Sequence, residues 1–397
     1  MQPVAAAGID YSRLHRQRYE RLQEQMAAQG VDALVLLHRP HVAYATGAPV
    51  TGDDVTHAVH RRPVAVVVAG QPRAHLLTDH RSGGLDVEAH AAVWPELDEG
   101  AVNLSGVLRE VLGDVAGRRI GVDELTGAML RSDVLAEAEQ VDAARVVGAA
   151  KLVKTEEELA CIGEAQRLTQ AAMVDTQAAL APGRRRSEVS GVFLRRLHEL
   201  GAGPNLIDPI FQPMPRRIAD GPRTTTGHVA FPTGVGDRPL AWGALVWVDA
   251  GVDFGGYASD FGRTWVVGRD PTAAEHGLFD RWQAVMDAVL DRLVPGCTSG
   301  DLARAAAAAA DGKNPWLPHF YLAHGVGIES AEMPLIGTDL GPAFDDAFVL
   351  APGMVLVLEP VIWEDGVGGY RAEEIVAVTE DGWRLLGGGH PYAPFGP

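Results

Sequence analysis

The first third of the chain carries short apolar segments separated by polar turns. Leu14, Leu22 and Met26 recur among charged residues and predict a helix from about Tyr11 to Gln29 that Gly30 ends. Buried strands are predicted by five apolar segments: DALVLL, VAYATG, PVAVVVAG, AHLLT and RIGVDE. A helical pattern follows through Leu135. Strands that alternate with helices predict an α/β domain over residues 1–150.

From residue 151 onward, apolar positions recur at helical spacing over longer stretches. Thr155 and Glu158 form a capping box that opens the first helix. Three further helices are predicted over residues 187–200, 272–293 and 299–311. Residues 201–243 are rich in proline and glycine and show little periodicity. Two pairs of helices around a hairpin-rich sheet predict an α+β domain over residues 151–397.

One stretch of this second domain combines apolar strands with acidic residues. Residues 245–264, LVWVDAGVDFGGYASDFGRT, predict two strands joined by a Gly-rich loop. Asp249 ends the first strand, and Asp260 lies inside the second. A carboxylate in such a strand is costly unless a cation or a hydrogen bond compensates it. Two of them across a hairpin can converge on a divalent metal ion. The alternative is that both aspartates are acids of turns and strand edges.

Three later segments add further metal-ligand types. His324 lies in the Gly-rich loop HGVG, and Glu359 lies in the apolar strand MVLVLEPVIW. Glu373 and Glu374 open another strand, YRAEEIVAV. Neighbours on a strand point to opposite faces, so only one of these two glutamates can join a site. Two aspartates, one histidine and two glutamates are enough to hold a pair of metal ions.

These residues lie in motifs that resemble those of the pita-bread metallopeptidases, the family of aminopeptidase P, prolidase, methionine aminopeptidase and the metal-free creatinase. The motifs are DAG, GYASD with RT, HGVG, LEP, and R-A-E-E before a strand and VTEDG. They occur in the family's order over the last 245 residues or so. The resemblance implies a C-terminal pita-bread (creatinase/aminopeptidase) fold over 151–397, preceded by a smaller α/β creatinase-like N-terminal domain.

The same resemblance implies five metal ligands: Asp249, Asp260, His324, Glu359 and Glu373. It implies that Asp249 binds one ion, that His324 binds the other, and that Asp260 and Glu373 bridge the two. Glu373 matches the ligand position of the family's Arg-x-Glu-Asp pattern. Glu374 then either supports the ligands from behind or lies exposed. Arg371 matches the arginine of that pattern and would orient neighbouring carboxylates.

The implied activity is that of a dinuclear metal-dependent hydrolase resembling Xaa-Pro aminopeptidases and dipeptidases. A hydroxide bridged by two divalent ions would attack an amide carbonyl, with Glu359 as the acceptor of its proton. Manganese is the favoured ion, with cobalt, iron and zinc as alternatives. Glu359, His324 and Arg371 are the expected catalytic residues, together with His228 as a candidate histidine on the substrate side.

The chain departs from its relatives on the substrate side. Peptidases of this family follow HGxG with His-Glu-x-Pro, whereas this chain has Ala331 in place of that histidine. A Ser-Gly-x-Asn stretch and a His-Tyr pair, which prolidase-like relatives carry before DAG, are also absent. The arginines between residues 216 and 238 either bind a substrate carboxylate or belong to a solvated loop. Two alternatives therefore stay open: a non-peptide hydrolase or metal-dependent lyase on the same scaffold, and a catalytically inactive binding module.

Composition narrows the partners. The 397 residues carry a formal net charge of -18, which argues against nucleic acid and against anionic membranes. With only two cysteines, no disulfide framework is expected. The sequence shows neither the apolar core of a signal peptide nor an apolar run long enough to span a membrane, so we expect a cytoplasmic protein. The expected partners are a small peptide or amide-like substrate and a second copy of the chain. The polar loop 52–62 is a candidate element of that homodimer.

Seven of the fourteen histidines lie in the first half of the chain. They are His38, His41, His57, His60, His75, His80 and His90. No pair has helical ligand spacing beside a carboxylate motif, so surface positions are favoured over a metal site.

Overall fold

The chain folds into two units, Asp10–Lys151 and Leu152–Pro397 with Met1–Ile9, in this computed structural model. The structure describes residues 8–49, 62–79, 84–132, 135–203, 205–220, 238–317 and 321–389, and of residues 205–210 it describes the backbone alone. No helix within these ranges is long and apolar enough to cross a membrane.

The smaller unit is built on a mixed six-stranded sheet in the order β4-β3-β2-β1-β5-β6. The strands are β1 (Ala33–Leu36), β2 (Val64–Val68), β3 (Ala74–Leu77), β4 (Val87–His90), β5 (Arg119–Val122) and β6 (Glu139–Asp142). The two central pairs β1–β2 and β2–β3 are antiparallel, and the outer pairs are parallel. Parallel neighbours require crossover segments, and the segments from β1 to β5 and from β5 to β6 contain helices.

Helices cover both faces of this sheet. They are α1 (Tyr11–Gln29), α2 (Arg39–Thr46), α3 (Asp98–Leu112), α4 (Gly127–Arg131) and α5 (Ala143–Lys151). Leu104 and Leu108 of α3 share a buried cluster with Val35 of β1. Leu34 points to the other face, where its side chain and Ala143 of α5 both pack against Gly121 of β5. The α/β architecture expected from alternating strands and helices is therefore present, and α1 ends at Gly30 in the left-handed conformation as expected.

One strand prediction in this unit is wrong. The VAYATG segment belongs to helix α2, which ends where Gly47 adopts a φ of 74°. Pro40 in the first turn supplies a preset helical φ, and the Thr46 hydroxyl donates to the carbonyl oxygen of Val42 one turn earlier at 2.6 Å. A short, wholly buried apolar run carries no periodicity that separates a strand from a helix.

The expectation of surface histidines also needs correction at one position. His41 is buried, and its Nδ1 lies 2.9 Å from a carboxylate oxygen of Asp123. The same carboxylate accepts from the backbone N–H groups of Leu37 and His38. His38 is exposed as expected, whereas His57, His60 and His80 lie outside the described residues.

The larger unit contains two pairs of long helices. These are α6 (Glu156–Ala178) with α7 (Arg186–Glu199), and α8 (Ala273–Arg292) with α9 (Ser299–Ala309); α10 (Pro342–Ala347) and a 3-10 turn, Ile218–Asp220, are short. The predicted capping box of α6 is confirmed, with the Thr155 hydroxyl and the Glu158 carboxylate each accepting a backbone N–H of the other residue. All four long helices lie close to their predicted positions.

Three sheets accompany these helices. The first has the order β10-β8-β7, with β9 on β8; the second has the order β12-β11-β13-β16-β17; β14 and β15 form a hairpin. The strands are β7 (Asn205–Pro213), β8 (Leu245–Phe254), β9 (Tyr257–Ala258), β10 (Phe261–Val266), β11 (Ala323–Gly325), β12 (Glu332–Ile336), β13 (Val355–Leu358), β14 (Val361–Glu364), β15 (Gly368–Arg371), β16 (Glu374–Val378) and β17 (Trp383–Leu385). Strand β7 lies in the segment that showed no periodicity, and its pairing with β8 is interrupted by two register shifts.

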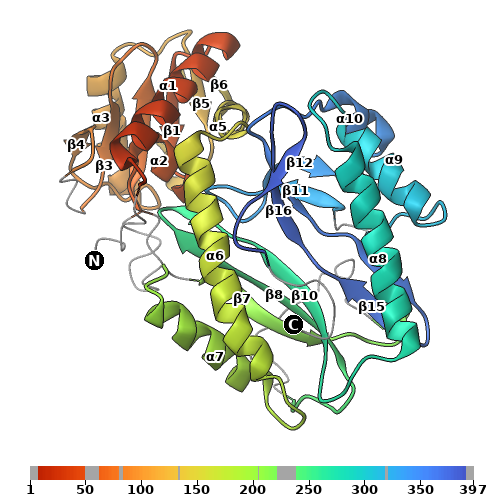
Figure 1. Ribbon diagram of the computed structural model, residues 1–397. Helices are drawn as coiled ribbons and strands as arrows, with labels where there is room; N and C mark the ends of the chain where they lie inside the picture. The colour runs from red at the N-terminus through yellow and green to blue at the C-terminus, as the bar shows by residue number, and fades with distance from the viewer. Residues whose placement is uncertain are drawn as a thin grey trace. The chain divides into compact units, whose positions relative to one another are not determined.

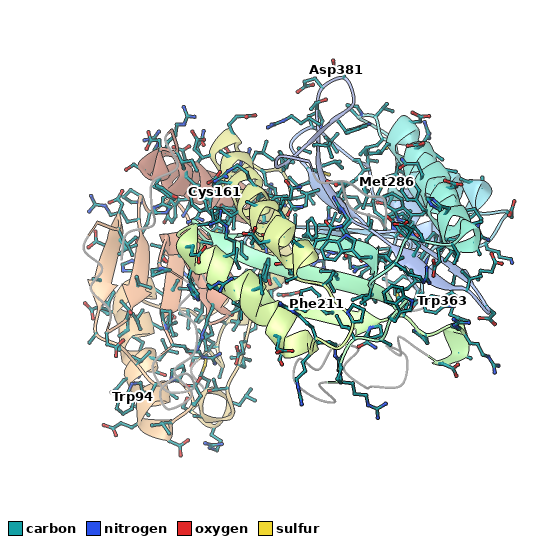
Figure 2. The ribbon with its side chains drawn as sticks, turned by 60° about the horizontal axis from the view of Figure 1, so that its bottom comes forward. Trp94, Cys161, Phe211, Met286, Trp363 and Asp381 are labelled. Atoms are coloured by element: carbon teal, nitrogen blue, oxygen red, sulfur yellow. The ribbon has the colours of Figure 1, made fainter. Side chains whose placement is uncertain are left out.

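The two larger sheets each pack one face on a helix pair (Figure 1). Val246 and Val248 of β8 share a cluster with Leu168 of α6 and Phe193 of α7. Leu356 and Leu358 of β13 share another with Trp282 of α8 and Leu302 of α9. Figure 2 shows this division, with Cys161 on α6 and Phe211 on β7 apart from Met286 on α8. The helices thus leave the alternate residues of these strands facing away from them.

Candidate metal centre

Asp249 and Asp260 come together through the hairpin predicted from the sequence. Asp249 lies within β8, and Asp260 falls in the break between β9 and β10. The turn is tight because Gly255 and Gly256 both adopt positive φ angles of 63° and 84°, which glycine tolerates without strain. Strand β10 then pairs with β8, with Gly262 opposite Asp249. The second strand of the prediction is therefore two short strands, and Asp260 lies between them.

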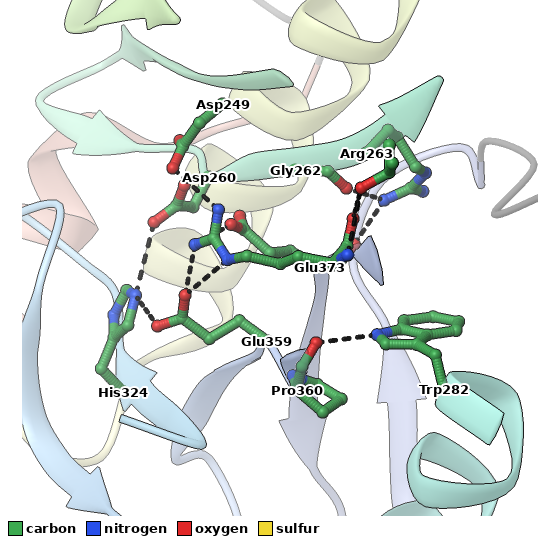
Figure 3. Close-up of polar contacts among 11 residues, drawn as sticks. Asp249, Asp260, Gly262, Arg263, Trp282, His324, Glu359, Pro360 and Glu373 are labelled. Atoms are coloured by element: carbon green, nitrogen blue, oxygen red, sulfur yellow. Dashed lines mark hydrogen bonds and ion pairs between the residues drawn. The ribbon is translucent and has the colours of Figure 1, made fainter. Parts of the chain in front are cut away.

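The alternation of side chains along the strands determines the direction of the other three candidate ligands, His324, Glu359 and Glu373. Ala323 and Leu358 belong to the cluster under α8 and α9, so the next residues, His324 and Glu359, turn to the opposite face. Glu373 precedes β16, and Ala372 and Val376 belong to the same cluster. The side chains converge with those of the two aspartates (Figure 3).

The distances define one compact centre. Carboxylate oxygens of Asp249, Asp260 and Glu373 lie within 4.8 Å of one another. The Nε2 atom of His324 is 3.5 Å from Asp260 Oδ2 and 3.3 Å from Glu359 Oε1. The Nδ1 atom of the same ring is 2.9 Å from the carbonyl oxygen of Gly325. A proton on Nδ1 would satisfy that contact and leave the lone pair of Nε2 directed at the carboxylates.

Arg371 lies among the carboxylates. One guanidinium nitrogen is 2.9 Å from Asp249 Oδ2, another is 3.1 Å from Glu359 Oε2, and the third contacts both Glu359 and Glu373. The guanidinium also lies 4.2 Å from the ring centre of Trp247, on the same face of β8 as Asp249. These contacts place Arg371 where the family resemblance expects an arginine that orients carboxylates.

Burial leaves this centre short of positive charge. All four carboxylates are buried, and burial raises the pKa of Asp260 to about 7 and the pKa values of Asp249 and Glu373 above their usual range. The neighbouring carboxylates of Asp249 and Glu359 contribute to the raised pKa of Asp260, and the surrounding acids raise the pKa of Arg371 against the lowering effect of its burial. Four ionised carboxylates against one guanidinium leave three negative charges uncompensated.

The residues present fit divalent metal ions. Asp249 Oδ1 and Glu373 Oε2 are buried and have no hydrogen-bond partner among the described residues. Buried carboxylate oxygens without donors are costly unless a cation coordinates them. Oxygen donors with one imidazole form a hard-ligand set that suits such ions, and their charge would offset the surplus at this centre.

The remaining candidate residues take varied positions. Tyr257 is buried and donates to Glu158 Oε1 at 2.8 Å, so it does not reach the carboxylate centre by that contact. Glu374 is buried rather than exposed. Ala331 is exposed just before β12, and Arg216, Arg217 and Arg238 are exposed as well. His228 and Arg223 lie outside the described residues.

Some supporting residues were not singled out by the sequence alone. Trp282 of α8 donates from its indole nitrogen to the carbonyl oxygen of Pro360 at 3.0 Å, next to Glu359 (Figure 3). Arg263 and Thr264 of β10 reach across to the segment that carries Arg371 and Glu373. The RT pair was visible as part of a motif, but no local pattern shows which distant groups these side chains contact.

Comparisons with known proteins agree with the two-domain fold. A family model described as metallopeptidase family M24 matches residues 160–380, and one described as the creatinase/prolidase N-terminal domain matches residues 18–155. With the buried carboxylate centre, these matches define a metal-dependent hydrolase. The chain belongs to metallopeptidase family M24, and the family implies divalent metal ions. The predicted family, with its pita-bread domain and creatinase-like N-terminal domain, is confirmed.

Individual relatives span nearly the whole chain. An uncharacterized peptidase of Bacillus subtilis is 26% identical over 379 residues, covering 93% of this chain and 97% of its own. A Xaa-Pro dipeptidase of Pyrococcus horikoshii is 26% identical, with 93% and 96% covered. The crystal structure of an X-Pro aminopeptidase from Thermotoga maritima superposes with a TM-score of 0.75 at 20% identity, with 95% and 99% covered. That structural likeness concerns the fold.

Proposed function

We propose that the chain hydrolyses small peptides with a proline after the scissile bond, using two divalent ions held by Asp249, Asp260, His324, Glu359 and Glu373. The observation that carries the proposal is the convergence of these five buried side chains, four of them carboxylates, on one centre that holds a single guanidinium. A binding module has no use for so many buried carboxylates, whose mutual repulsion is relieved either by protonation or by bound cations.

The names of the relatives support the substrate. The Pyrococcus horikoshii protein is a Xaa-Pro dipeptidase and the Thermotoga maritima protein an X-Pro aminopeptidase. For the metal, we favour manganese, because four carboxylates and one imidazole match its preference for oxygen ligands. Cobalt, iron and zinc are the alternatives to be compared.

Each protein residue has a role in this proposal. By the family resemblance, Asp260 and Glu373 would help to hold both ions, whereas Asp249 and His324 would each hold one; an Asp260 carboxylate oxygen lies near those of Asp249 and Glu373, and Oδ2 is 3.5 Å from His324. Glu359 presents Oε1 to the centre while Arg371 holds its Oε2, so that Oε1 is the atom placed to accept a proton. Two bound ions would supply Lewis acidity and lower the pKa of a water molecule. Arg371 keeps the carboxylates of Asp249 and Glu359 oriented.

The experiment is a metal-dependence measurement with matched variants. Protein stripped with a chelator is titrated with Mn²⁺ by calorimetry, and turnover of Xaa-Pro dipeptides is followed at each occupancy. We expect about two ions per chain, with turnover rising as the second site fills. Glu364→Gln is the control, because Glu364 is an exposed acid paired with Arg281 at 2.6 Å. Undiminished turnover by the stripped protein would contradict the proposal.

A second candidate function rests on Ala331. This residue is exposed at the position where related peptidases carry a histidine, and its methyl group can neither donate a proton nor accept a hydrogen bond. A non-peptide amide hydrolase or a metal-dependent lyase on the same centre would not need that donor. Normal Mn²⁺ binding without Xaa-Pro turnover, followed by activity on N-acyl amino acids or sulfonium compounds, would favour this candidate.

Two further expectations stay predictions. A homodimer is expected from the resemblance alone, because most of the loop 52–62 lies outside the described residues. Light scattering at working concentration tests it, and a fully active monomer would contradict it. The cytoplasmic location likewise stays a prediction, for which fractionation of cells is the measurement.

A further inference from the structure

The two central carboxylates of the candidate metal centre belong to different sheets. Asp260 directly precedes β10, the last strand of the sheet β10-β8-β7. Glu373 directly precedes β16, a strand of the sheet that contains β11 and β13. A strand ladder fixes the register of residues within one sheet. No such ladder joins β10 to β16 within the described part of the chain, so other contacts must set the spacing of Asp260 and Glu373.

Side chains of β10 supply those contacts. One guanidinium nitrogen of Arg263 donates to the carbonyl oxygens of Gly262 at 2.8 Å and of Glu373 at 2.5 Å. The Thr264 hydroxyl donates to the carbonyl oxygen of Arg371 at 2.7 Å and accepts from the Arg371 N–H at 3.0 Å. Backbone adds one direct bond, from the Glu373 N–H to the Gly262 carbonyl oxygen at 2.9 Å. Two consecutive side chains thus hold the backbone on both sides of Ala372.

Arg263 is itself held in a single position. Its other terminal nitrogen donates to Glu374 Oε1 at 2.5 Å, and its guanidinium lies 4.6 Å from the ring centre of Phe261. The side chains of Arg263 and Glu374 are 0% and 2% exposed. A buried arginine with a carboxylate and two carbonyl partners has few alternative rotamers, because each would leave a charge without a partner.

Glycine at position 262 lets the two segments approach closely. A Cβ atom built at Gly262 would lie 2.4 Å from Glu373 Oε1 and 2.5 Å from its carboxyl carbon. The Glu373 side chain therefore lies directly over the backbone of β10 (Figure 3). A shift of either segment by a few tenths of an ångström would move the Glu373 carboxylate relative to Asp260.

We infer that Arg263, with Glu374 as its counter-charge and Thr264 beside it, is a positioning residue that sets the spacing between the Asp260 and Glu373 carboxylates. None of the three residues would touch a metal ion or the substrate. The inference rests on the proposed dinuclear site. It assigns Glu374 the opposite role from its neighbour: Glu373 faces the centre, whereas Glu374 anchors the arginine behind it.

The test separates positioning from folding. The double variant Arg263→Met/Glu374→Leu removes both charges together and leaves apolar groups of similar size, so that no buried charge is left without a partner. Arg263→Lys keeps the charge but loses the planar fork, and Thr264→Val keeps the shape but loses the hydroxyl. Glu374→Gln retains an acceptor for Arg263. Each variant is compared with wild type by thermal melting without metal, by Mn²⁺ calorimetry and by electron paramagnetic resonance at saturating Mn²⁺.

We expect the double variant to melt as cooperatively as wild type and to bind the second Mn²⁺ about 10- to 100-fold more weakly, as for other residues that support metal ligands. Its resonance signal should report a changed magnetic coupling between the two ions. Arg263→Lys and Thr264→Val should weaken the second ion less, and Glu374→Gln least. Turnover at saturating substrate should fall while KM changes little.

A matched control is Arg269→Met. Arg269 donates two hydrogen bonds of 2.8 Å to the carboxylate of Glu275, which lies in the first turn of α8. This variant should lower the melting temperature without changing Mn²⁺ affinity or the resonance signal. Wild-type Mn²⁺ affinity and coupling in both the double variant and Arg263→Lys would overturn the inference. Failure of the wild-type protein to bind two Mn²⁺ ions would instead remove the proposed function on which the inference rests.

Discussion

Two groups of buried charges lie on either side of the segment 371–374, and they differ in how their charge is compensated. At the candidate metal centre, four carboxylates lie around one guanidinium, that of Arg371, which contacts Asp249, Glu359 and Glu373. Behind it, Arg263 and Glu374 form a pair of one cation and one anion, and a second nitrogen of the guanidinium donates to two carbonyl oxygens. Both groups are equally buried, so burial alone does not distinguish them.

The difference shows which buried charges need an external partner. A one-to-one pair balances its own charge, even though its contribution to stability is small or unfavourable relative to apolar residues. A surplus of carboxylates is incomplete. Burial, with a further contribution from the neighbouring carboxylates, raises the pKa values of Asp249, Asp260 and Glu373. The surplus therefore indicates function, and the balanced pair indicates positioning.

The largest effect should follow from removing one carboxylate of the surplus. Asp260→Ala is expected to lower turnover of an Xaa-Pro dipeptide at least about a hundredfold, because metal ions contribute several kcal/mol to such transition states. Metal content by mass spectrometry should fall in parallel. Glu364→Gln, at an exposed acid, should leave both unchanged. Full turnover by Asp260→Ala would make the charge surplus irrelevant to activity.

Metal ions should stabilise the fold through the same surplus. A ligand that binds only the native state adds about 2.7 kcal/mol at a free concentration of a hundred times its Kd. We expect a stabilisation of this size per ion in urea unfolding with Mn²⁺, and its loss in Asp260→Ala. Arg269→Met, which breaks a compensated pair, should lower stability but keep the Mn²⁺ increment. An equal increment in Asp260→Ala would place the bound ions elsewhere.

A smaller effect should separate the charge of the centre from its contacts with substrate. Ala331→His introduces a hydrogen-bond donor at the position where related peptidases carry histidine. Removing one preorganised donor from an active site typically lowers kcat on the order of a hundredfold. We expect kcat/KM for Xaa-Pro dipeptides to rise about tenfold or more while Mn²⁺ affinity is unchanged. Wild-type turnover already at the level of the variant would show that the departure is neutral.

The smallest effect concerns a single buried acid outside both groups. Asp253, in the hairpin turn of β8, accepts from the Gly256 N–H, and burial raises its pKa to about 6. The folded state then binds its proton more tightly than the unfolded state does, so stability falls as pH rises from about 4 to about 6. The Asp253→Asn variant has no titrating group at this position, so its free energy of unfolding does not show this fall.

The gap in unfolding free energy between Asp253→Asn and wild type should therefore widen by about 1–2 kcal/mol between pH values of about 4.5 and 7.5. Urea unfolding of metal-free protein at both pH values measures it. A gap independent of pH would mean that Asp253 is as well solvated as an ordinary surface acid.

Local sequence signals determined much of this protein. The helix α1 with its terminal Gly30, the capping box of α6 and the tight turn at Gly255 and Gly256 were all readable from neighbouring residues. Such features depend on residues within a few positions of one another, where backbone preference and side-chain period act directly. The acids and the histidine that converge were identified instead by the resemblance of their motifs, in order and spacing, to those of a family.

The tertiary structure decided what lies between those signals. The segment VAYATG became helix α2 rather than a strand, since a run buried on all sides has no period to read. His41 became a buried partner of Asp123, 82 positions away. Glu374 acquired Arg263, 111 positions earlier, as its counter-charge. The sequence alone predicted that Glu373 and Glu374 point to opposite faces of one strand. The packing of two sheets decided that Glu373 faces the candidate metal centre and that Glu374 contacts Arg263 behind it. Neither segment alone encodes its contacts with a segment that is distant along the chain.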